Sequence, residues 1–338
     1  MYTTIEVSAA GGLQRFCELE GMPALSAESV FTSGADAYLL LTGPTGDVAR
    51  CSLWWSAAPP YPSHRLGLIG HYGAKDLDAG THILALASAR LAAHGCTLAA
   101  GPMDGSTARR YRLVTERGEE PPFFLEPDNP DDWPAHWTAA GFSSLAEYYS
   151  ALQPTLDHAD PRLPALSAHF EGMNVCVRPL DLGCFDDELR LIYTVAAPSF
   201  LDNFLATPLD ETEFLAQYRP IRPYTRPELV LLAQQGDKLL GFVFALPDWL
   251  QAQRGAPVTT VIVKTLAVLP DTAGHGLATL LSARLQENAV QLGFTRAIHA
   301  LMHERNVSRR VSARFDGHIF RRYTLYARTL DGRRGEDT

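Results

Sequence analysis

Residues 264–281 read KTLAVLPDTAGHGLATLL: an apolar run, a proline-ended turn, two glycines one residue apart, and a run typical of a helix. Successive backbone N–H groups of a glycine-bearing loop, followed by the positive end of a helix, can hold a pyrophosphate without a basic side chain. A dinucleotide-binding fingerprint needs a third glycine and a later acidic residue, and a Walker loop needs Gly-Lys-Ser/Thr. Neither pattern is present, so the stretch predicts an anion cradle of another type.

This loop resembles motif A of the Gcn5-related N-acetyltransferases (GNAT), which reads Gln/Arg-x-x-Gly-x-Gly/Ala. Gly276 and Ala278 match that pattern, whereas Ala273 stands in place of the usual Gln or Arg. We expect this replacement to weaken phosphate binding. The alternative, for the loop alone, is an ordinary glycine-rich turn between a strand and a helix. The resemblance assigns the contacts with an acyl-CoA to Leu266, Ala267, Val268, Ala273, Gly274, His275, Gly276, Leu277, Ala278 and Thr279.

The flanking sequence favours the resemblance over an ordinary turn. Apolar runs bounded by turn residues predict strands at 229–233, 239–246, 261–268 and 297–302, the first two joined as a hairpin. Leu277, Leu281 and Leu285 recur at helical spacing, and Gly293 ends that helix. The order of strands, loop and helix is therefore the one that the resemblance requires.

Polar residues after the last of these strands resemble the second motif of the same family. There an Asn meets the pantetheine arm of the coenzyme and the next helix lies along it, which here implies contacts from Asn306 and Arg309. The resemblance also implies that a main-chain amide among residues 266–268 polarises the thioester carbonyl, with direct transfer to an amine.

Composition narrows the class of protein. The chain has 338 residues, of which 46% are apolar, enough for two cores of ordinary size. Its net charge of -9 makes nucleic acid or an anionic membrane an unexpected partner. The five cysteines are scattered and form no Cys-x-x-Cys pair, so neither a disulfide framework nor a metal site is expected. The N-terminus lacks the basic and apolar regions of a signal peptide, which predicts a cytoplasmic protein.

The chain reads as two copies of one fold. Prolines and aspartates at 154–164 favour a linker, and the sequence Ser-Ala-Arg-Leu occurs at 88–91 and again at 282–285. We therefore predict an α/β (α+β) protein of two tandem GNAT-like domains, each a mixed, mostly antiparallel sheet flanked by helices. The expected boundaries are 1–153 for a degenerate first domain, 154–169 for the linker and 170–338 for the domain that binds acyl-CoA.

The first half is not expected to bind coenzyme A. The 194-residue offset of the repeat places 79–84 on the cradle, where His82 and Leu84 would crowd a phosphate and the nearby Asp76 would repel it. This half then supports the fold or forms part of the acceptor pocket. Residues 101–112 are polar loop residues that suggest a site or a capped turn, and 121–133 suggest a packed loop or a substrate lid.

The general base and acid are less clear from the residues. His299 and His303 share one face of a predicted strand, and His303, with Glu304 as a weaker choice, is the candidate base. The family's usual acid, a Tyr, is replaced by Ala313, which leaves Tyr323, Tyr326 or water as substitutes, with Tyr323 as the candidate. We expect an N-acyltransferase that uses acetyl-CoA or another acyl-CoA, no metal, and a small-molecule amine. The alternative is a non-catalytic acyl-CoA sensor or assembly module, and the sequence gives no indication of the oligomeric state.

Overall fold

The computed structural model describes residues 2–7, 12–44, 46–156, 160–272, 274–304 and 317–330. Its strands are β1 (Thr3–Glu6), β2 (Ala37–Gly43), β3 (Gly46–Trp54), β4 (Leu66–Ala74), β5 (Leu98–Gly101), β6 (Leu113–Glu116), β7 (Ser143–Gln153), β8 (Val175–Pro179), β9 (Val230–Gln235), β10 (Lys238–Pro247), β11 (Thr260–Val268), β12 (Arg296–His303) and β13 (His318–Thr329). Its α-helices are α1 (Leu13–Cys17), α2 (Ala27–Thr32), α3 (Leu77–Ala93), α4 (Trp133–Ala139), α5 (Leu163–Gly172), α6 (Phe185–Phe200), α7 (Glu211–Tyr218), α8 (Trp249–Gln253) and α9 (Leu277–Gln291).

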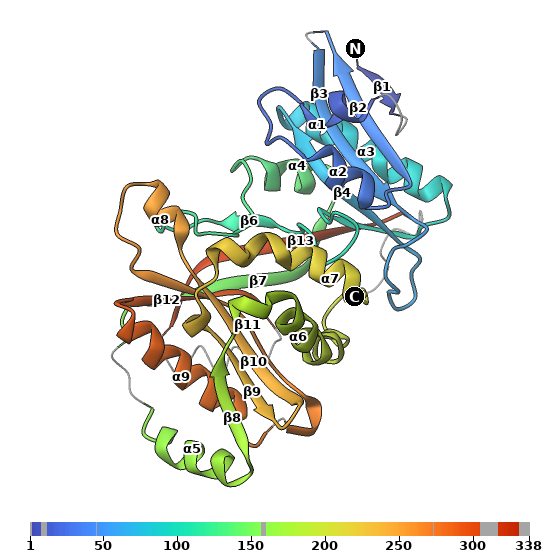
Figure 1. Ribbon diagram of the computed structural model, residues 1–338. Coiled ribbons are helices and arrows are strands. Elements are labelled where there is room, and N and C mark those ends of the chain that lie inside the picture. The colour runs from blue at the N-terminus through green and yellow to red at the C-terminus, as the bar shows by residue number, and fades with distance from the viewer. Residues whose placement is uncertain are drawn as a thin grey trace, which may run out of the picture.

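These strands form one continuous mixed sheet whose order is symmetric about its centre. The order is β1-β2-β3-β4-β5-β13-β7-β12-β11-β10-β9-β8, with β6 beside β13. Two pairs, β4 with β5 and β11 with β12, are parallel, and the other pairs are antiparallel. The first six strands of the order and the last six thus repeat one arrangement in reverse, which confirms the predicted tandem fold with mixed, mostly antiparallel sheets (Figure 1).

The two halves exchange their last strands. β13, which follows β12 in the chain, pairs with β5 and β6 of the first half, and β7 of the first half pairs with β12 of the second. β7 and β13 lie against each other across the middle of the sheet, where Tyr148 stands opposite Tyr323. The boundaries at 153 and 170 stay a prediction, but α5 begins at Leu163, inside the range expected to be a linker.

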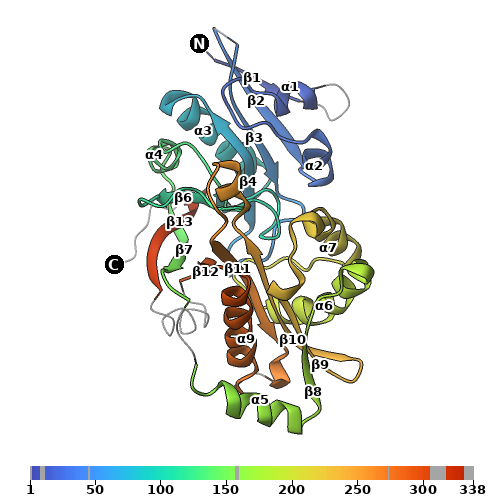
Figure 2. The same ribbon diagram turned by 60° about the vertical axis from the view of Figure 1, so that its left-hand side comes forward.

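Helices cover both faces of each half, as Figures 1 and 2 show from two sides. In the first half α3 and α4 bury Ile83 and Trp137 against β2 to β4, and α1 and α2 cover the other face around Phe16. In the second half α5 and α9 pack on one face around Leu281, and α6 and α7 pack on the other around Ile192. Each sheet face is thereby covered, as an amphipathic layered domain requires.

The local predictions agree with the structure in the second half. The expected hairpin, the strand before the loop, the helix after it and the final short strand are β9, β10, β11, α9 and β12. The repeated Ser-Ala-Arg-Leu, however, does not mark equivalent positions. Ser88 lies eleven residues after the start of α3, and Ser282 lies five residues after the start of α9. That part of the repeat prediction was wrong, and the tandem fold is established by strand order instead.

Candidate functional site

A gap opens in the sheet of the second half where two parallel strands part. β11 and β12 pair only from Thr260 opposite Arg296 to Val263 opposite His299. β11 continues to Val268 with β10 alone, so on its other side residues 264–268 border an opening rather than a strand. Leu266, Ala267 and Val268, predicted to meet the thioester, all lie on this stretch.

The glycine loop joins the end of this opening to a helix without a side-chain cap. Gly274 and Gly276 have φ angles of 87° and 92°, a left-handed conformation that favours glycine. Gly276 is the N-cap of α9, which has no side-chain cap and no acidic residue in its first turn. A Cβ on Gly276 would lie 2.7 Å from Cδ2 of Leu166. The loop therefore has the backbone and the charge environment that suit an anion.

The other residues assigned to the cradle are less uniform in their placement. Ala278 lines the cleft, Leu277 is buried in the core beneath it, and Thr279 lies in the first turn of α9. His275 is exposed, with Nδ1 3.4 Å from the carbonyl oxygen of Thr272. The remaining three, Ala273, Asn306 and Arg309, lie outside the described residues.

The first half lacks this loop altogether. Only two residues separate β4 from α3, whereas eight separate β11 from α9. Residues 79–84 therefore lie inside α3, and their predicted alignment with the cradle was wrong. The N-terminus of α3 is capped by its own carboxylate, because Asp76 Oδ1 accepts a 2.8 Å hydrogen bond from Ala79 N. A missing loop and an acidic cap, rather than the crowding expected at His82 and Leu84, separate the two halves.

The gap between β4 and β5 is filled by the chain itself. These strands pair only from Leu66 to Leu68, and residues 101–112 then occupy the space between them. Met103 N donates a 2.8 Å hydrogen bond to Ile69 O, and His71 N donates a 2.5 Å bond to Asp104 Oδ1. We call residues 101–112 the plug. No helix starts at Asp104 or Ser106, so the capped-turn alternative was wrong: the segment closes the first gap through one backbone hydrogen bond and one to the Asp104 carboxylate.

The second gap opens into a cleft of about 1910 Å³ that both halves line. The second half contributes the end of β11, one face of α9, and Phe200 and Tyr218 from α6 and α7. The first half contributes residues 107–112 of the plug and the loop at 125–131. The first half therefore forms one wall of the cleft, and the expectation that it shares the acceptor pocket stays a prediction.

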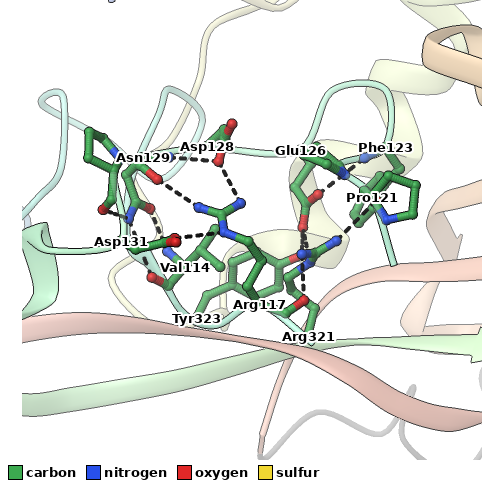
Figure 3. A network of polar contacts seen from close by, with 12 residues as sticks. Val114, Arg117, Pro121, Phe123, Glu126, Asp128, Asn129, Asp131, Arg321 and Tyr323 are labelled. Carbon is green, nitrogen blue, oxygen red and sulfur yellow. Dashed lines mark hydrogen bonds and ion pairs between the residues drawn. The ribbon is translucent and has the colours of Figure 1, made fainter. Parts of the chain in front are cut away.

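The loop at 117–131 is held in place by a buried ion-pair network (Figure 3). Glu126 Oε1 lies 2.9 Å from Nε of Arg321 and accepts a 2.5 Å hydrogen bond from the Tyr323 hydroxyl. Burial raises the pKa of Glu126, while the bond from Tyr323 and the charge of Arg321 oppose that rise. Arg117 bonds Asp128 and Asp131 on the same loop. The predicted alternative of a packed loop describes this segment better than a mobile lid.

A lysine stands at the mouth of the gap. Lys264 is the first residue of β11 beyond its last pairing with β12, and its side chain lines the cleft. Its Nζ donates a 3.4 Å hydrogen bond to the carbonyl oxygen of Leu125. Burial, together with the nearby charge of Arg112, lowers the pKa of Lys264 to about 8, against the opposing charge of Glu126. A single charged side chain in a mostly apolar strand was the signal that could have identified Lys264 from the sequence.

The two predicted catalytic side chains lie apart from each other. His303 lines an adjoining hollow of about 1180 Å³, with its ring 4.9 Å from that of Tyr148. Tyr323 is fully buried in the core beside β7, where its hydroxyl bonds Glu126 and Ser150. Burial raises the pKa of Tyr323, which disfavours the ionised form. His299, which shares the predicted strand face with His303, lines the main cleft. Burial lowers the pKa of His299 to about 4.

Two further features bear on the class of site. Among the described residues, no group of three or more His, Cys, Asp or Glu side chains is placed to hold a metal ion. No helix of the described chain has the length and apolar character needed to cross a membrane. Cationic side chains, among them Arg112 and Lys264, lie in the wall of the cleft, and the helix α9, whose N-terminus has no side-chain cap, lines it through Ala278.

Comparison with known proteins agrees with this geometry. Residues 190–315 match the family model of the acetyltransferase (GNAT) family, and no curated protein matches the chain. A GCN5-related N-acetyltransferase from Sphaerobacter thermophilus is 15% identical with a TM-score of 0.50, over 100% of this chain and 98% of that one. A tandem GNAT protein from the clavulanic acid biosynthesis pathway is 13% identical with a TM-score of 0.51, over the full length of both chains. Eis1 of Mycobacterium abscessus is 12% identical with a TM-score of 0.52, over 98% of this chain and 74% of that one. Residues 190–315 are therefore similar in sequence to the GNAT family, and the whole chain has the fold of these GNAT structures.

Proposed function

We propose that the protein is an N-acyltransferase that takes its acyl group from acetyl-CoA or another acyl-CoA and binds that donor in its second half. One observation carries the proposal: the gap beyond Val263 and His299 opens beside a glycine loop and a helix without a side-chain cap, whereas the equivalent helix of the first half, α3, follows a two-residue turn and is capped by Asp76. The GNAT fold supports acyl transfer in general.

The residues around the gap suit direct transfer to an amine. Main-chain amides at 266–268 would polarise the thioester carbonyl. The backbone amide N–H groups at the start of α9 and in its loop would hold the pyrophosphate. A carbon–nitrogen bond forms and the carbon–sulfur bond breaks. The amine loses a proton to a base, for which we retain His303, and the thiolate takes up a proton. Tyr323 reaches the cleft only through Glu126, so we propose that any role in that protonation runs through this carboxyl group.

The proposal is tested first by binding. Gly276→Asp places a carboxylate and a Cβ where the loop must approach phosphate, so acetyl-CoA affinity measured by calorimetry should fall at least about 100-fold. Gly255→Asp is the matched control, since Gly255 also has a left-handed φ, of 75°, and open space around its Cα. Equal affinity in the two variants would show that the loop does not bind the donor.

Catalysis is tested separately by release of free thiol from acetyl-CoA in the presence of a panel of amines. Turnover with any amine supports the enzyme. Tight donor binding without turnover across a broad panel would favour the alternative, an acyl-CoA sensor or assembly module.

A further inference from the structure

Arg112 is a buried cation in the cleft wall without an acidic partner. It is the last residue of the plug, it lines the cleft, and it is 5% exposed. Its guanidinium carbon lies 4.0 Å from the ring centre of Tyr111 and 4.1 Å from that of Tyr148. The one hydrogen bond of its side chain to the described residues runs from Nη1 to the Tyr111 hydroxyl, at 2.7 Å. Its buried Nε has no hydrogen-bond partner among those residues. The centre of a third ring, that of Tyr323, lies 5.7 Å from the guanidinium carbon. A buried guanidinium in this state favours an anionic ligand, because among the described residues its charge is compensated only by aromatic rings and one hydroxyl.

The plug fixes this side chain in place. Arg112 N donates a 2.8 Å hydrogen bond to Pro102 O, and Met103 pairs with Tyr111 across the plug. Arg112 itself has a φ of 65°, a conformation that is unusual for a residue with a side chain. Such a backbone outlier, held by surrounding bonds, is common where a side chain must be aimed at a ligand.

Lys264, on β11 of the second half, adds a second cation to the lining of the cleft. The two side chains are close enough for Arg112 to lower the pKa of Lys264. Glu126, the acidic group whose charge acts on Lys264, is already paired with Arg321 and bonded by Tyr323. Arg112 and Lys264 therefore form a pair of like charges that the described residues do not neutralise.

Other cations at the cleft differ from this pair. Arg109 forms an ion pair with Glu213, at 3.2 Å, and Arg117 forms ion pairs with Asp128 and Asp131, both at 2.8 Å. Arg110 also lines the cleft without an ion pair to the described residues, but its guanidinium donates a hydrogen bond to the carbonyl oxygen of Asp128. The lack of a carboxylate partner is therefore shared by Arg110, Arg112 and Lys264 and not by Arg109 and Arg117.

We propose that Arg112 and Lys264 form a subsite for a carboxylate group of the acyl acceptor, so that the substrate is a small amine that also carries a carboxylate, as an amino acid does. The inference rests on the proposed function, because the acceptor is defined by the transfer reaction. Arg112 is a substrate-binding residue supplied by the half that has lost the glycine loop, and its planar guanidinium suits a carboxylate.

A carboxylate could also enter the cleft on the donor, as in a dicarboxylic acyl-CoA. The experiment separates these sources by crossing two comparisons. Amino acids are compared with the amines left by their decarboxylation, such as phenylalanine with phenethylamine and lysine with cadaverine. Acetyl-CoA is compared with succinyl-CoA as donor.

The variants are Arg112→Gln and Lys264→Met, with Arg109→Gln as the control that removes a cation from the same segment. Each is first checked for fold by circular dichroism and for donor affinity by calorimetry. With acetyl-CoA, we expect Arg112→Gln and Lys264→Met to lower kcat/KM for the amino acids about 10- to 100-fold. For the decarboxylated amines the change should stay below about 3-fold, and Arg109→Gln should keep the wild-type preference.

Three results would overturn the assignment. Equal losses for amino acids and their decarboxylated amines would make the two residues structural. Unchanged values for both would remove them from the site. Loss of a preference for succinyl-CoA, with no change among acceptors, would move the carboxylate to the donor.

Binding of N-acetylphenylalanine and N-acetylphenethylamine to the coenzyme A complex gives a readout that does not depend on turnover. Arg112→Gln should abolish any preference for N-acetylphenylalanine over N-acetylphenethylamine. A wild-type protein that binds donor but neither prefers the carboxylate nor loses affinity on substitution contradicts the subsite, whereas failure of donor binding contradicts the proposed function itself.

Discussion

Gly70→Ala should destabilise the protein far more than its small size suggests. A Cβ on Gly70 would lie 2.2 Å from the carbonyl oxygen of Met103, 2.6 Å from its carbon and 2.7 Å from Asp104 Oδ1. Two of these atoms are backbone, and the plug is tied to β4 on both sides of Gly70 by the bonds from Met103 N to Ile69 O and from His71 N to Asp104 Oδ1. The clash cannot be relieved by turning one flexible side chain.

The expected cost follows from what must move. Displacing the plug weakens or breaks those two buried hydrogen bonds, at roughly 1–3 kcal/mol each where a buried group is left unpaired, so we expect a loss of about 2–4 kcal/mol. Gly73→Ala on the same strand is the matched control. Its Cβ would meet the Arg50 side chain at 3.5 Å, an ordinary contact, and its effect should stay within about 1 kcal/mol.

Urea unfolding followed by tryptophan fluorescence measures both variants. Trp54 lies beside the plug, since a Cβ on Gly105 would be 2.9 Å from its Nε1, and it should report the displacement. Gly70→Ala should also raise KM for the acceptor by moving Arg112, while donor affinity stays unchanged. Equal stability of the two alanine variants would refute the account of the plug as a rigid closure of the first gap.

Three more variants test the cleft wall and the buried residues that support it. Lys264→Met should stabilise the protein by about 1–2 kcal/mol at pH 7, a gain that disappears as pH rises from about 8 to above 10, and that urea titrations across this range would follow. The sign follows because native Lys264 loses its proton at a lower pH than the unfolded chain, so the wild type gains stability through that window; a gain independent of pH would contradict the placement. Glu126→Gln should cost about 3–5 kcal/mol in the same urea assay, because it leaves Arg321 buried without its counter-ion, and a cost below about 1 kcal/mol would count against that pair. Tyr323→Phe should lower kcat at least about 100-fold if the hydroxyl takes part in protonating the thiolate, whereas a change below about 5-fold in single-turnover rates would leave it a structural residue.

The local part of the fold was accessible from the sequence because its signals lie within a few residues of one another. The apolar run at 261–268, the glycines at 274 and 276 and the helical leucines that follow predicted β11, the loop and α9 in the right order. The cradle could be found in the same way, since it is made by one continuous segment of backbone.

The cleft wall could not be found so easily, because distant segments build it. Arg112 and Lys264 are 152 positions apart in the chain, and the pairing of β7 with β12 and of β13 with β5, β6 and β7 brings the two halves together. Strand pairing depends on packing over the whole sheet, and a repeat in the sequence predicts two copies of a fold without saying which strand joins which copy. The six extra residues of the second loop also broke the constant offset, so the comparison of 79–84 with the cradle failed at the helix start.

The exchange of β7 and β13 has a consequence for the order in which the protein can fold during synthesis. β5 needs β13 as its neighbour, yet about two hundred residues separate them in the chain. At the usual pace of translation the edge of β5 waits roughly 10 to 40 s for its partner. An unpaired strand edge is a template for association with other chains, so we expect the nascent first half to depend on chaperones until β13 has emerged.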